Sequence, residues 1–137
     1  MRGILFLCVA NSARSQLAEG LARAVVPADV KVWSAGSRPT SVRPEAVEVL
    51  KELGLDISSH RSKAVADIPA GEVDTVITLC AEEECPVFLG KARRLHWGLP
   101  DPAAVSGSPE ARLDAFRATR DELRRRIGQL LEAPCEP

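Results

Sequence analysis

Short runs of apolar residues alternate along this chain with longer segments in which apolar residues recur every three or four positions. Apolar runs bounded by turn residues are typical of strands buried in a parallel sheet, whereas the wider spacing is typical of amphipathic helices. The first run, Ile4 to Leu7, ends at Cys8. The pattern predicts this strand and three more, which span residues 30–34, 73–79 and 93–97.

The segment after the first strand has the spacing of a helix. Ser15 can act as its N-cap, and Pro27 stops it. One face carries apolar residues at four-residue intervals, namely Leu17, Leu21 and Val25. We therefore expect a helix from Ser15 that ends between residues 23 and 26, with these side chains in the core.

Two further helices are predicted. Pro44 suits the first turn of a helix, and Gly54 is a typical residue at its end. The last helix begins at Ser108 and Pro109 and has the longest apolar stripe, made of Leu113, Phe116, Leu123, Ile127, Leu130 and Leu131. Its other face is rich in Arg, Asp and Glu and is expected to face solvent.

The predicted order of elements is strand, helix, strand, helix, strand, loop, strand, helix. Residues 56–71 are polar and irregular, with at most short helical pieces, and residues 80–91 have the character of a loop. This alternation predicts an α/β fold, a three-layer sandwich with a four-stranded parallel sheet flanked by helices. We expect one domain over residues 1–137, since neither half looks like a separate folding unit.

Composition and charge argue against several classes of function. The chain has 18 basic and 19 acidic residues, well mixed, for a net charge of −1. It therefore offers no basic surface for nucleic acid or an anionic membrane. The N-terminal apolar run is too short for a signal peptide or a membrane span, so a cytoplasmic protein is expected. In a reducing compartment its thiols, Cys8, Cys80, Cys85 and Cys135, are more often catalytic, redox-active or metal-binding than structural.

Cys8 and Arg14 lie six residues apart, between the first strand and the first helix. A tight loop at this place points backbone N–H groups and the positive end of the helix at one spot, which binds tetrahedral oxyanions and favours a thiolate. Arg14 adds a planar cation suited to two oxygens of phosphate or arsenate. The predicted oxyanion-binding loop comprises Cys8, Val9, Ala10, Asn11, Ser12, Ala13 and Arg14.

Two residues of this region can assist the thiol. Ser15 can donate a hydrogen bond to the Cys8 sulfur, and Asn11 tolerates the left-handed backbone that such a loop requires. The alternative is that Cys8 only ends a buried strand. A strand precedes Cys8, and a serine and a helix follow Arg14. This context favours the functional interpretation, in which Cys8 is a nucleophile and Arg14 binds the anion in the same loop.

The run Cys8-Val-Ala-Asn-Ser-Ala-Arg-Ser15, with Gln16 and Ala18-Glu-Gly20, resembles the signature loop of the low-molecular-weight protein tyrosine phosphatase superfamily, in particular of its thioredoxin-coupled arsenate reductases. Ala10 replaces a frequent glycine of that loop, and Ala13 a frequent second cysteine. The resemblance covers nearly the whole chain. Further segments resemble those reductases in the same order: Ser34-Ala-Gly36, Leu53–Ser58 with Ser62-Lys63, Cys85–Phe88 and Asp101-Pro102.

The resemblance implies that Asp101 is the general acid that protonates the leaving oxygen. Pro100 and Pro102 restrict the backbone on either side of it. Phosphatases of the superfamily commonly have aromatic residues directly after this Asp-Pro, whereas Ala103 and Ala104 follow here and the chain contains no Tyr. This favours a small inorganic oxyanion, arsenate, with phosphate and sulfate as competing oxyanions.

The resemblance also implies a relay through Cys80 and Cys85. Cys80 would attack a Cys8–arsenic adduct, release arsenite and leave a Cys8–Cys80 disulfide, and Cys85 would then attack Cys80 and free Cys8. Thioredoxin is the expected reductant of the final disulfide. The interval between Cys80 and Cys85 is shorter than family members often have. The alternative is a pair of half-buried thiols without a redox role.

Other polar residues are candidates for support or for binding a metal. As in the resembled family, Asn11 with Ser34 is expected to support the loop through hydrogen bonds, and Glu19, found around a monovalent cation in some members, is a weaker candidate. Zinc binding by Cys80, Cys85 and His96 is disfavoured because their spacing matches no compact zinc motif and a fourth ligand is not evident. We therefore expect no metal and no cofactor.

These observations favour a thioredoxin-dependent arsenate reductase over two alternatives. One is a phosphatase that hydrolyses phosphomonoesters through a phosphoenzyme on Cys8, which would need Arg14 and Asp101 but neither relay cysteine. The other is a non-enzymatic protein that binds an oxyanion or a metal. Two residues of interest remain. His60 is expected to be structural, and Cys135 is expected to lie in the C-terminal tail.

Overall fold

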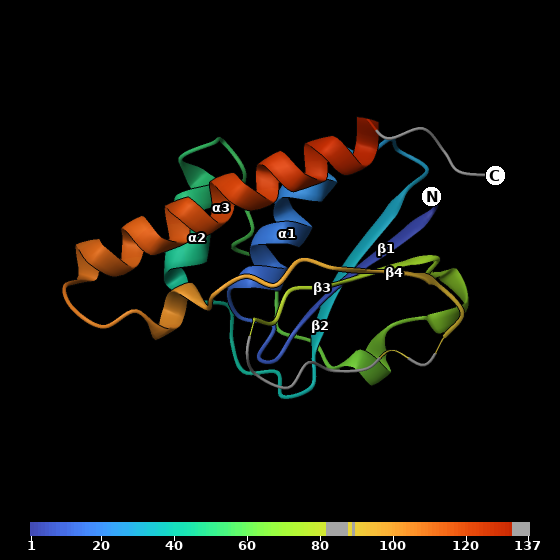
Figure 1. Ribbon diagram of the computed structural model, residues 1–137, viewed down its shortest axis with the longest axis horizontal. Helices are drawn as coiled ribbons and strands as arrows, with labels where there is room; N and C mark the ends of the chain where they lie inside the picture. The colour runs from blue at the N-terminus through green and yellow to red at the C-terminus, as the bar shows by residue number, and fades with distance from the viewer. Residues whose placement is uncertain (82–87, 89, 133–137) are drawn as a thin grey trace.

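A computed structural model describes residues 1–81, 88 and 90–132 of the chain. Four strands within them form one sheet in the order β2-β1-β3-β4, and every neighbouring pair is parallel (Figure 1). The strands are β1 (Gly3–Cys8), β2 (Lys31–Gly36), β3 (Thr75–Thr78) and β4 (Arg93–His96). All six residues of β1 are buried, because this strand has a neighbour on both sides and a layer on each face. The four strands are confirmed, and β3 is shorter than its apolar run predicts.

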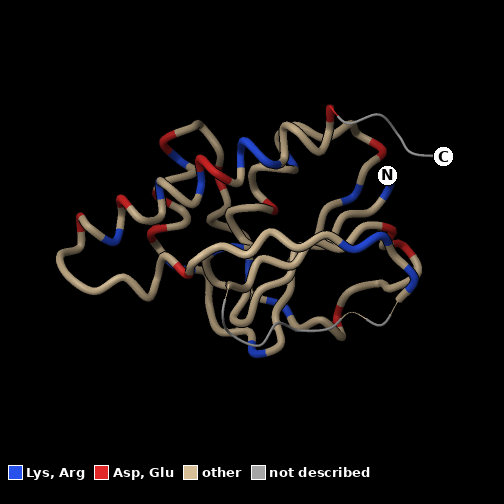
Figure 2. Tube along the Cα trace, viewed as in Figure 1, with Lys and Arg blue, Asp and Glu red and all other residues tan. Residues whose placement is uncertain are grey.

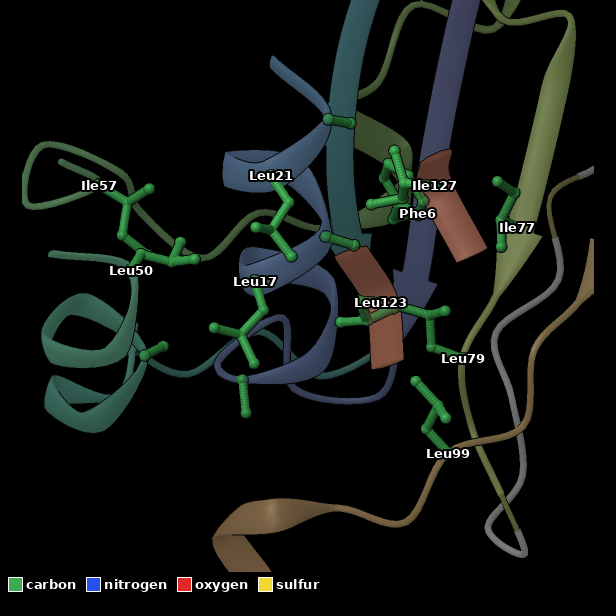
Figure 3. Packing of buried hydrophobic residues seen from close by; sticks show 14 of the residues in the cluster. Phe6, Leu17, Leu21, Leu50, Ile57, Ile77, Leu79, Leu99, Leu123 and Ile127 are labelled. Atoms are coloured by element: carbon green, nitrogen blue, oxygen red, sulfur yellow. The ribbon is translucent and has the colours of Figure 1, made fainter. Parts of the chain in front are cut away.

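Three α-helices lie together on one face of the sheet (Figure 1): α1 (Arg14–Arg23), α2 (Pro44–Lys51) and α3 (Pro109–Glu132). Their apolar faces and the sheet enclose the larger core, in which Phe6, Leu17 and Leu123 have no exposed surface (Figure 3). Each fully buried side chain of this size contributes about 1.5–3 kcal/mol to folding. The core fixes the start of α1 against the end of β1.

The other face of the sheet is covered by a thinner layer. It contains two short 3-10 helices, η1 (Val65–Asp67) and η2 (Ala70–Glu72), within the predicted irregular segment. A second apolar cluster lies there, comprising Leu5, Leu7, Ala35, Ile68, Val73, Val76 and Phe88. The predicted α/β sandwich with a four-stranded parallel sheet is therefore confirmed, with all three α-helices on one face.

The start of α1 differs from the prediction, and its end lies at the first residue of the predicted range. The helix begins at Arg14, and Ala13 stands at the N-cap without a side-chain hydrogen bond, so Ser15 is not the cap. The helix ends at Arg23, ahead of Pro27. Val25 consequently lies beyond the helix and is 58% exposed, because the four-residue spacing no longer directs it to the core.

Helix α3 begins as predicted, with the Ser108 hydroxyl accepting a hydrogen bond from the Ala111 N–H (3.1 Å). Along this helix Figure 2 shows both basic and acidic residues. Of these, Arg120 is 8% exposed and donates to the Val49 carbonyl (2.8 Å) and to Glu52 Oε1 (2.7 Å), which fastens α3 to α2. Among the described residues, no helix is long and apolar enough to cross a membrane.

Candidate functional site

In the loop between β1 and α1, four backbone carbonyl groups accept hydrogen bonds from residues outside the loop. The N–H groups of Arg38, Thr40 and Arg43 donate to the carbonyls of residues 9, 10 and 12, at 2.9, 3.1 and 2.9 Å. The carbonyl of Asn11 accepts from the hydroxyl of Ser62 at 2.6 Å. In a trans peptide the following N–H points opposite to the carbonyl. The N–H groups of residues 10–13 therefore point into the loop, and such a nest binds anions.

Gly36, the last residue of β2, lets the loop pack closely against the sheet. A Cβ atom at this position would lie 2.3 Å from the Val9 carbonyl oxygen and 2.9 Å from the Asn11 nitrogen. Both distances are far below van der Waals contact, so only glycine fits without moving the loop. Together with the N–H groups of Arg38, Thr40 and Arg43, the end of β2 and the segment after it form the outer wall of the oxyanion loop.

Asn11 has the left-handed backbone expected of it, with φ of +50°. Its side-chain oxygen accepts from the backbone N–H of Lys63 (2.8 Å) and from Gln16 Nε2 (3.0 Å). Its side-chain nitrogen donates to Ser15 Oγ (2.7 Å). A backbone N–H can only donate, so Lys63 fixes which end of the Asn11 amide is oxygen.

Cys8 is a free thiol, buried at the end of β1, and its sulfur lies 2.8 Å from Ser15 Oγ. The Ser15 oxygen already accepts a hydrogen bond from Asn11. Its own proton is therefore available for the Cys8 sulfur, an arrangement that stabilises a thiolate. Ser15 is the second residue of α1 and points back to the strand.

Arg14 brings the ends of three strands together at the loop. It is 3% exposed, and one terminal guanidinium nitrogen donates to the Leu99 carbonyl (2.9 Å) and approaches the Leu79 carbonyl (3.5 Å). Leu79 directly precedes Cys80, and Leu99 is two residues before Asp101. The carboxyl ends of neighbouring parallel strands thus place the segments of both candidate residues beside the guanidinium.

Asp101 is half-buried and directly precedes the 3-10 helix η3 (Pro102–Ala104). Its Oδ1 accepts from the Ala103 N–H at 3.0 Å, which leaves the other carboxyl oxygen to carry a proton. Cys80 is 1% exposed and is disulfide-bonded. Cys85 and Cys135 lie outside the described residues.

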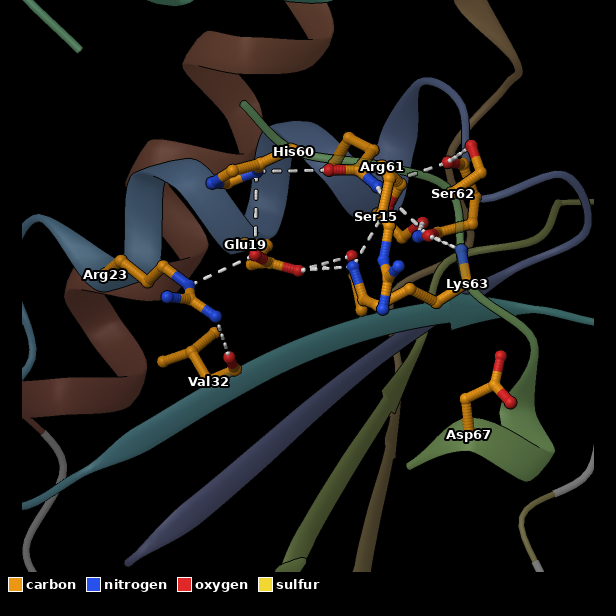
Figure 4. A network of polar contacts seen from close by, with 12 residues as sticks. Ser15, Glu19, Arg23, Val32, His60, Arg61, Ser62, Lys63 and Asp67 are labelled. Carbon is orange, nitrogen blue, oxygen red and sulfur yellow. Dashed lines mark hydrogen bonds and ion pairs between the residues drawn. The ribbon is translucent and has the colours of Figure 1, made fainter. Parts of the chain in front are cut away.

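Behind the loop, Glu19 is the centre of a polar network (Figure 4). Ser34 was expected to support the loop together with Asn11; it donates to Glu19 Oε1 at 2.6 Å, and Lys63 links Glu19 to the Asn11 side chain. Arg23 Nε lies 3.1 Å from Glu19 Oε2, and Lys63 Nζ lies 3.4 Å from Glu19 Oε1. Among the described residues, no group of three or more His, Cys, Asp and Glu side chains is placed to hold a metal ion.

Gln16 and His60 join this network to the loop. Gln16 is fully buried, and its Nε2 donates to both oxygens of Asn11 and to the Arg61 carbonyl (2.9 Å). Its Oε1 therefore faces His60 Nδ1, 3.2 Å away. Burial lowers the pKa of His60, and the nearby Glu19 carboxylate opposes this shift.

Sequence reasoning missed the supporting role of Gln16, His60 and Lys63. The contact of Gln16 with His60 and that of Lys63 with Asn11 each join residues more than forty positions apart in the chain. Gln16 and Lys63 lie among the segments that resemble the reductases, whereas His60 does not, so no signal was available for it.

Comparisons with known proteins agree with this geometry. The sequence model of a family described as low molecular weight phosphotyrosine protein phosphatase matches residues 3–135. An arsenate reductase of Bacillus subtilis is 39% identical over 131 residues, which are 94% of each chain. A solved arsenate reductase in a phosphate-binding state is 32% identical, with a TM-score of 0.80 over 96% of this chain and 97% of that one. A thioredoxin-dependent arsenate reductase of Corynebacterium glutamicum, also 32% identical, has a TM-score of 0.66 over 96% of this chain and 64% of its own.

Proposed function

This chain belongs to the low molecular weight phosphotyrosine protein phosphatase family, and we propose that within this family it is a member that reduces arsenate to arsenite. The observation that carries the proposal is the loop itself. Its N–H groups converge beside a buried free thiol that has a hydroxyl donor, and Arg14 stands at its end. The names of the relatives favour arsenate over an organic phosphate as the substrate.

The first chemical step forms a bond between Cys8 and arsenic. The inward N–H groups and Arg14 bind arsenate, and the Cys8 thiolate attacks the arsenic atom. One arsenate oxygen leaves as water, taking one proton from Asp101 and one from the substrate. The product is a Cys8–S–As(V) adduct, and no electrons have yet been transferred.

The second step transfers two electrons. The Cys80 thiolate attacks the Cys8 sulfur, a disulfide forms, and the sulfur–arsenic bond breaks with its electron pair on arsenic, which leaves as arsenite. Cys85 then attacks Cys80 and releases Cys8 as a thiolate. Thioredoxin supplies two electrons to reduce the remaining disulfide. A disulfide-bonded Cys80 together with a free Cys8 supports this relay, since the relay ends in that state.

The proposal is tested by following NADPH consumption with arsenate, thioredoxin and thioredoxin reductase. We expect wild-type protein and Cys135→Ser to turn over, and Cys8→Ser, Cys80→Ser and Cys85→Ser to lose arsenate-dependent turnover. Full turnover by Cys80→Ser and Cys85→Ser would contradict the relay. Full turnover by Cys8→Ser would contradict the whole proposal.

Hydrolysis of phosphomonoesters is a second candidate function, favoured by the family match and by a loop that suits any tetrahedral oxyanion. It requires a phosphoenzyme on Cys8 but no relay cysteine. Hydrolysis of p-nitrophenyl phosphate by Cys80→Ser at the wild-type rate, with loss in Cys8→Ser, would show that the two chemistries are separable. A wild-type protein that hydrolyses this ester but does not turn over arsenate would favour the second candidate.

A further inference from the structure

Lys63 contacts the site with both its backbone and its side chain. Its N–H donates to Asn11 Oδ1 at 2.8 Å, and its carbonyl accepts from the Gly36 N–H at 2.9 Å. Its ammonium lies 3.4 Å from Glu19 Oε1 and 3.1 Å from the Arg61 carbonyl. One residue therefore joins the oxyanion loop, the end of β2 and the buried carboxylate of α1.

Glu19 needs a nearby cation because its side chain is only 3% exposed. A buried carboxylate is costly unless it is paired and hydrogen-bonded. The hydroxyl of Ser34 supplies one hydrogen bond. Of the two permanent cations beside Glu19, Arg23 is 54% exposed and Lys63 is 19% exposed, so water screens the charge of Arg23 more strongly.

The backbone N–H of Lys63 starts a chain of hydrogen bonds that ends at the nucleophile. It fixes the Asn11 amide, and the amide nitrogen donates to Ser15 Oγ. A thiolate at Cys8 can only accept, so the Ser15 hydroxyl, 2.8 Å away, is then the donor to the sulfur.

We propose that Lys63 is a positioning residue for Cys8: its ion pair with Glu19 holds the backbone N–H that directs the Ser15 hydroxyl to the sulfur. This inference rests on the proposed role of Cys8 as the nucleophile. Without the ammonium, the buried Glu19 carboxylate draws water or the 61–63 segment toward it. The N–H then shifts from Asn11, and the Cys8 thiolate loses its oriented donor.

The test is the pH dependence of Cys8 alkylation by iodoacetamide, with the modified residue identified by peptide mass. Lys63→Met keeps the length of the side chain and removes the charge. We expect Cys8 in this variant to react about tenfold more slowly near neutral pH, with its pH profile moved to higher pH. A change of about tenfold is the size expected for the loss of one hydrogen bond to a charged group. Lys63→Arg, which keeps the charge, should retain most of the wild-type rate.

Two further variants distinguish a specific effect of Lys63 on Cys8 from a non-specific effect of removing a lysine charge. Lys31→Met removes a lysine ion pair with Glu72 at the surface and should leave alkylation unchanged. Lys63→Met/Glu19→Gln removes both charges, so it should react faster than Lys63→Met alone. Wild-type alkylation by Lys63→Met would overturn the inference, as would a double variant no faster than Lys63→Met. Alkylation of Cys8 needs no arsenate. If the protein did not turn over arsenate, the effect of Lys63 on the alkylation rate could therefore still be measured.

Discussion

The side-chain nitrogen of Asn11 donates to Ser15 Oγ over 2.7 Å, and the sulfur of Cys8 lies 2.8 Å from the same oxygen. A Cys8 thiolate can only accept, so the Ser15 proton then faces the sulfur. A residue that looks like a helix cap in the sequence is instead the hydrogen-bond donor of the proposed nucleophile.

Ser15→Ala should therefore weaken the thiolate of Cys8. A hydrogen bond to a charged group contributes about 1.5–3 kcal/mol, which corresponds to roughly a 10- to 100-fold slower reaction of Cys8 near neutral pH. The measurement is the rate of p-nitrophenyl phosphate hydrolysis together with the pH profile of Cys8 alkylation. Ser58→Ala, at an exposed position, is the matched control. An unchanged pH profile in Ser15→Ala would contradict the assigned direction of the hydrogen bond.

Gly36→Ala should disrupt the oxyanion loop while leaving the sheet intact. Its new methyl group would lie 2.3 Å from the Val9 carbonyl oxygen, and the loop has to move to relieve this contact. We expect phosphate and arsenate to lose most of their stabilising effect in thermal unfolding, since ligand binding to the folded state raises the transition temperature. Gly71→Ala is the control, because a Cβ there meets nothing within 4 Å. Equal stabilisation of both variants by phosphate would refute the packing argument.

Asp101→Asn should slow the step in which the leaving oxygen is protonated. The amide oxygen of Asn can still accept from the Ala103 N–H, so the local backbone is expected to be retained. General acid catalysis typically contributes about 10²–10⁴-fold. The rate loss should be larger for phenyl phosphate than for p-nitrophenyl phosphate, because the poorer leaving group depends more on the proton. Equal losses for both esters would argue that Asp101 has another role.

The fold was predictable because hydrophobic periodicity marks elements that are buried on a regular face. The run from Ile4 to Leu7 indicated a buried strand, and the stripe around Phe116 and Leu123 indicated a helix packed on the core, and all of these residues are buried. The bounds were less predictable. Val25 fits the apolar spacing, yet the helix ends before it, since the spacing carries no information on where the backbone turns.

The site was predictable where its residues are neighbours in the sequence. Cys8, Asn11, Arg14 and Ser15 lie within eight consecutive residues, from the end of β1 to the start of α1. Hydrogen bonds connect Cys8, Asn11 and Ser15, and Arg14 directly precedes Ser15. Lys63 was not predictable, because its link to Asn11 depends on how two segments 52 residues apart pack together. For Ser15 the predicted cap was wrong, whereas its predicted contact with the Cys8 sulfur is present at 2.8 Å. A serine at the start of a helix suits both roles, and the sequence alone does not choose between them.

Glu52 should make the protein sensitive to acid. Hydrogen bonds from Arg117, the larger cause, and from Arg120 lower the pKa of Glu52 from 4.5 to about 2. The unfolded state then binds more protons between these values, so the stability that this pairing provides is present above pH 4.5 and lost as the pH falls toward about 2. Glu52→Gln should show a smaller loss of stability over this range in urea unfolding. Because the carboxylate is at the surface, the difference should shrink at high salt.

His60 should produce a separate change at milder pH. Burial lowers its pKa from the ordinary value of 6.5, so the folded protein resists protonation of a side chain that the unfolded chain protonates readily. Between 6.5 and the lower folded value the unfolded state binds more protons, and stability is therefore full above pH 6.5 and falls as the pH decreases. The groups facing the imidazole set the size of this change: Glu19 and Asp56 oppose the shift, whereas Arg23 and Lys63 add to it.

His60→Gln removes the titrating group and keeps a donor toward Gln16. The difference in unfolding temperature between about pH 7.5 and about pH 5.5 should be smaller in this variant than in the wild type, because only the wild type loses stability through this linkage. His96→Gln is the matched control, since His96 is exposed and bonded only to Thr78 and the neighbouring strand among the described residues. If His60→Gln and the wild type lost the same number of degrees, the buried imidazole would not be the source of the pH dependence.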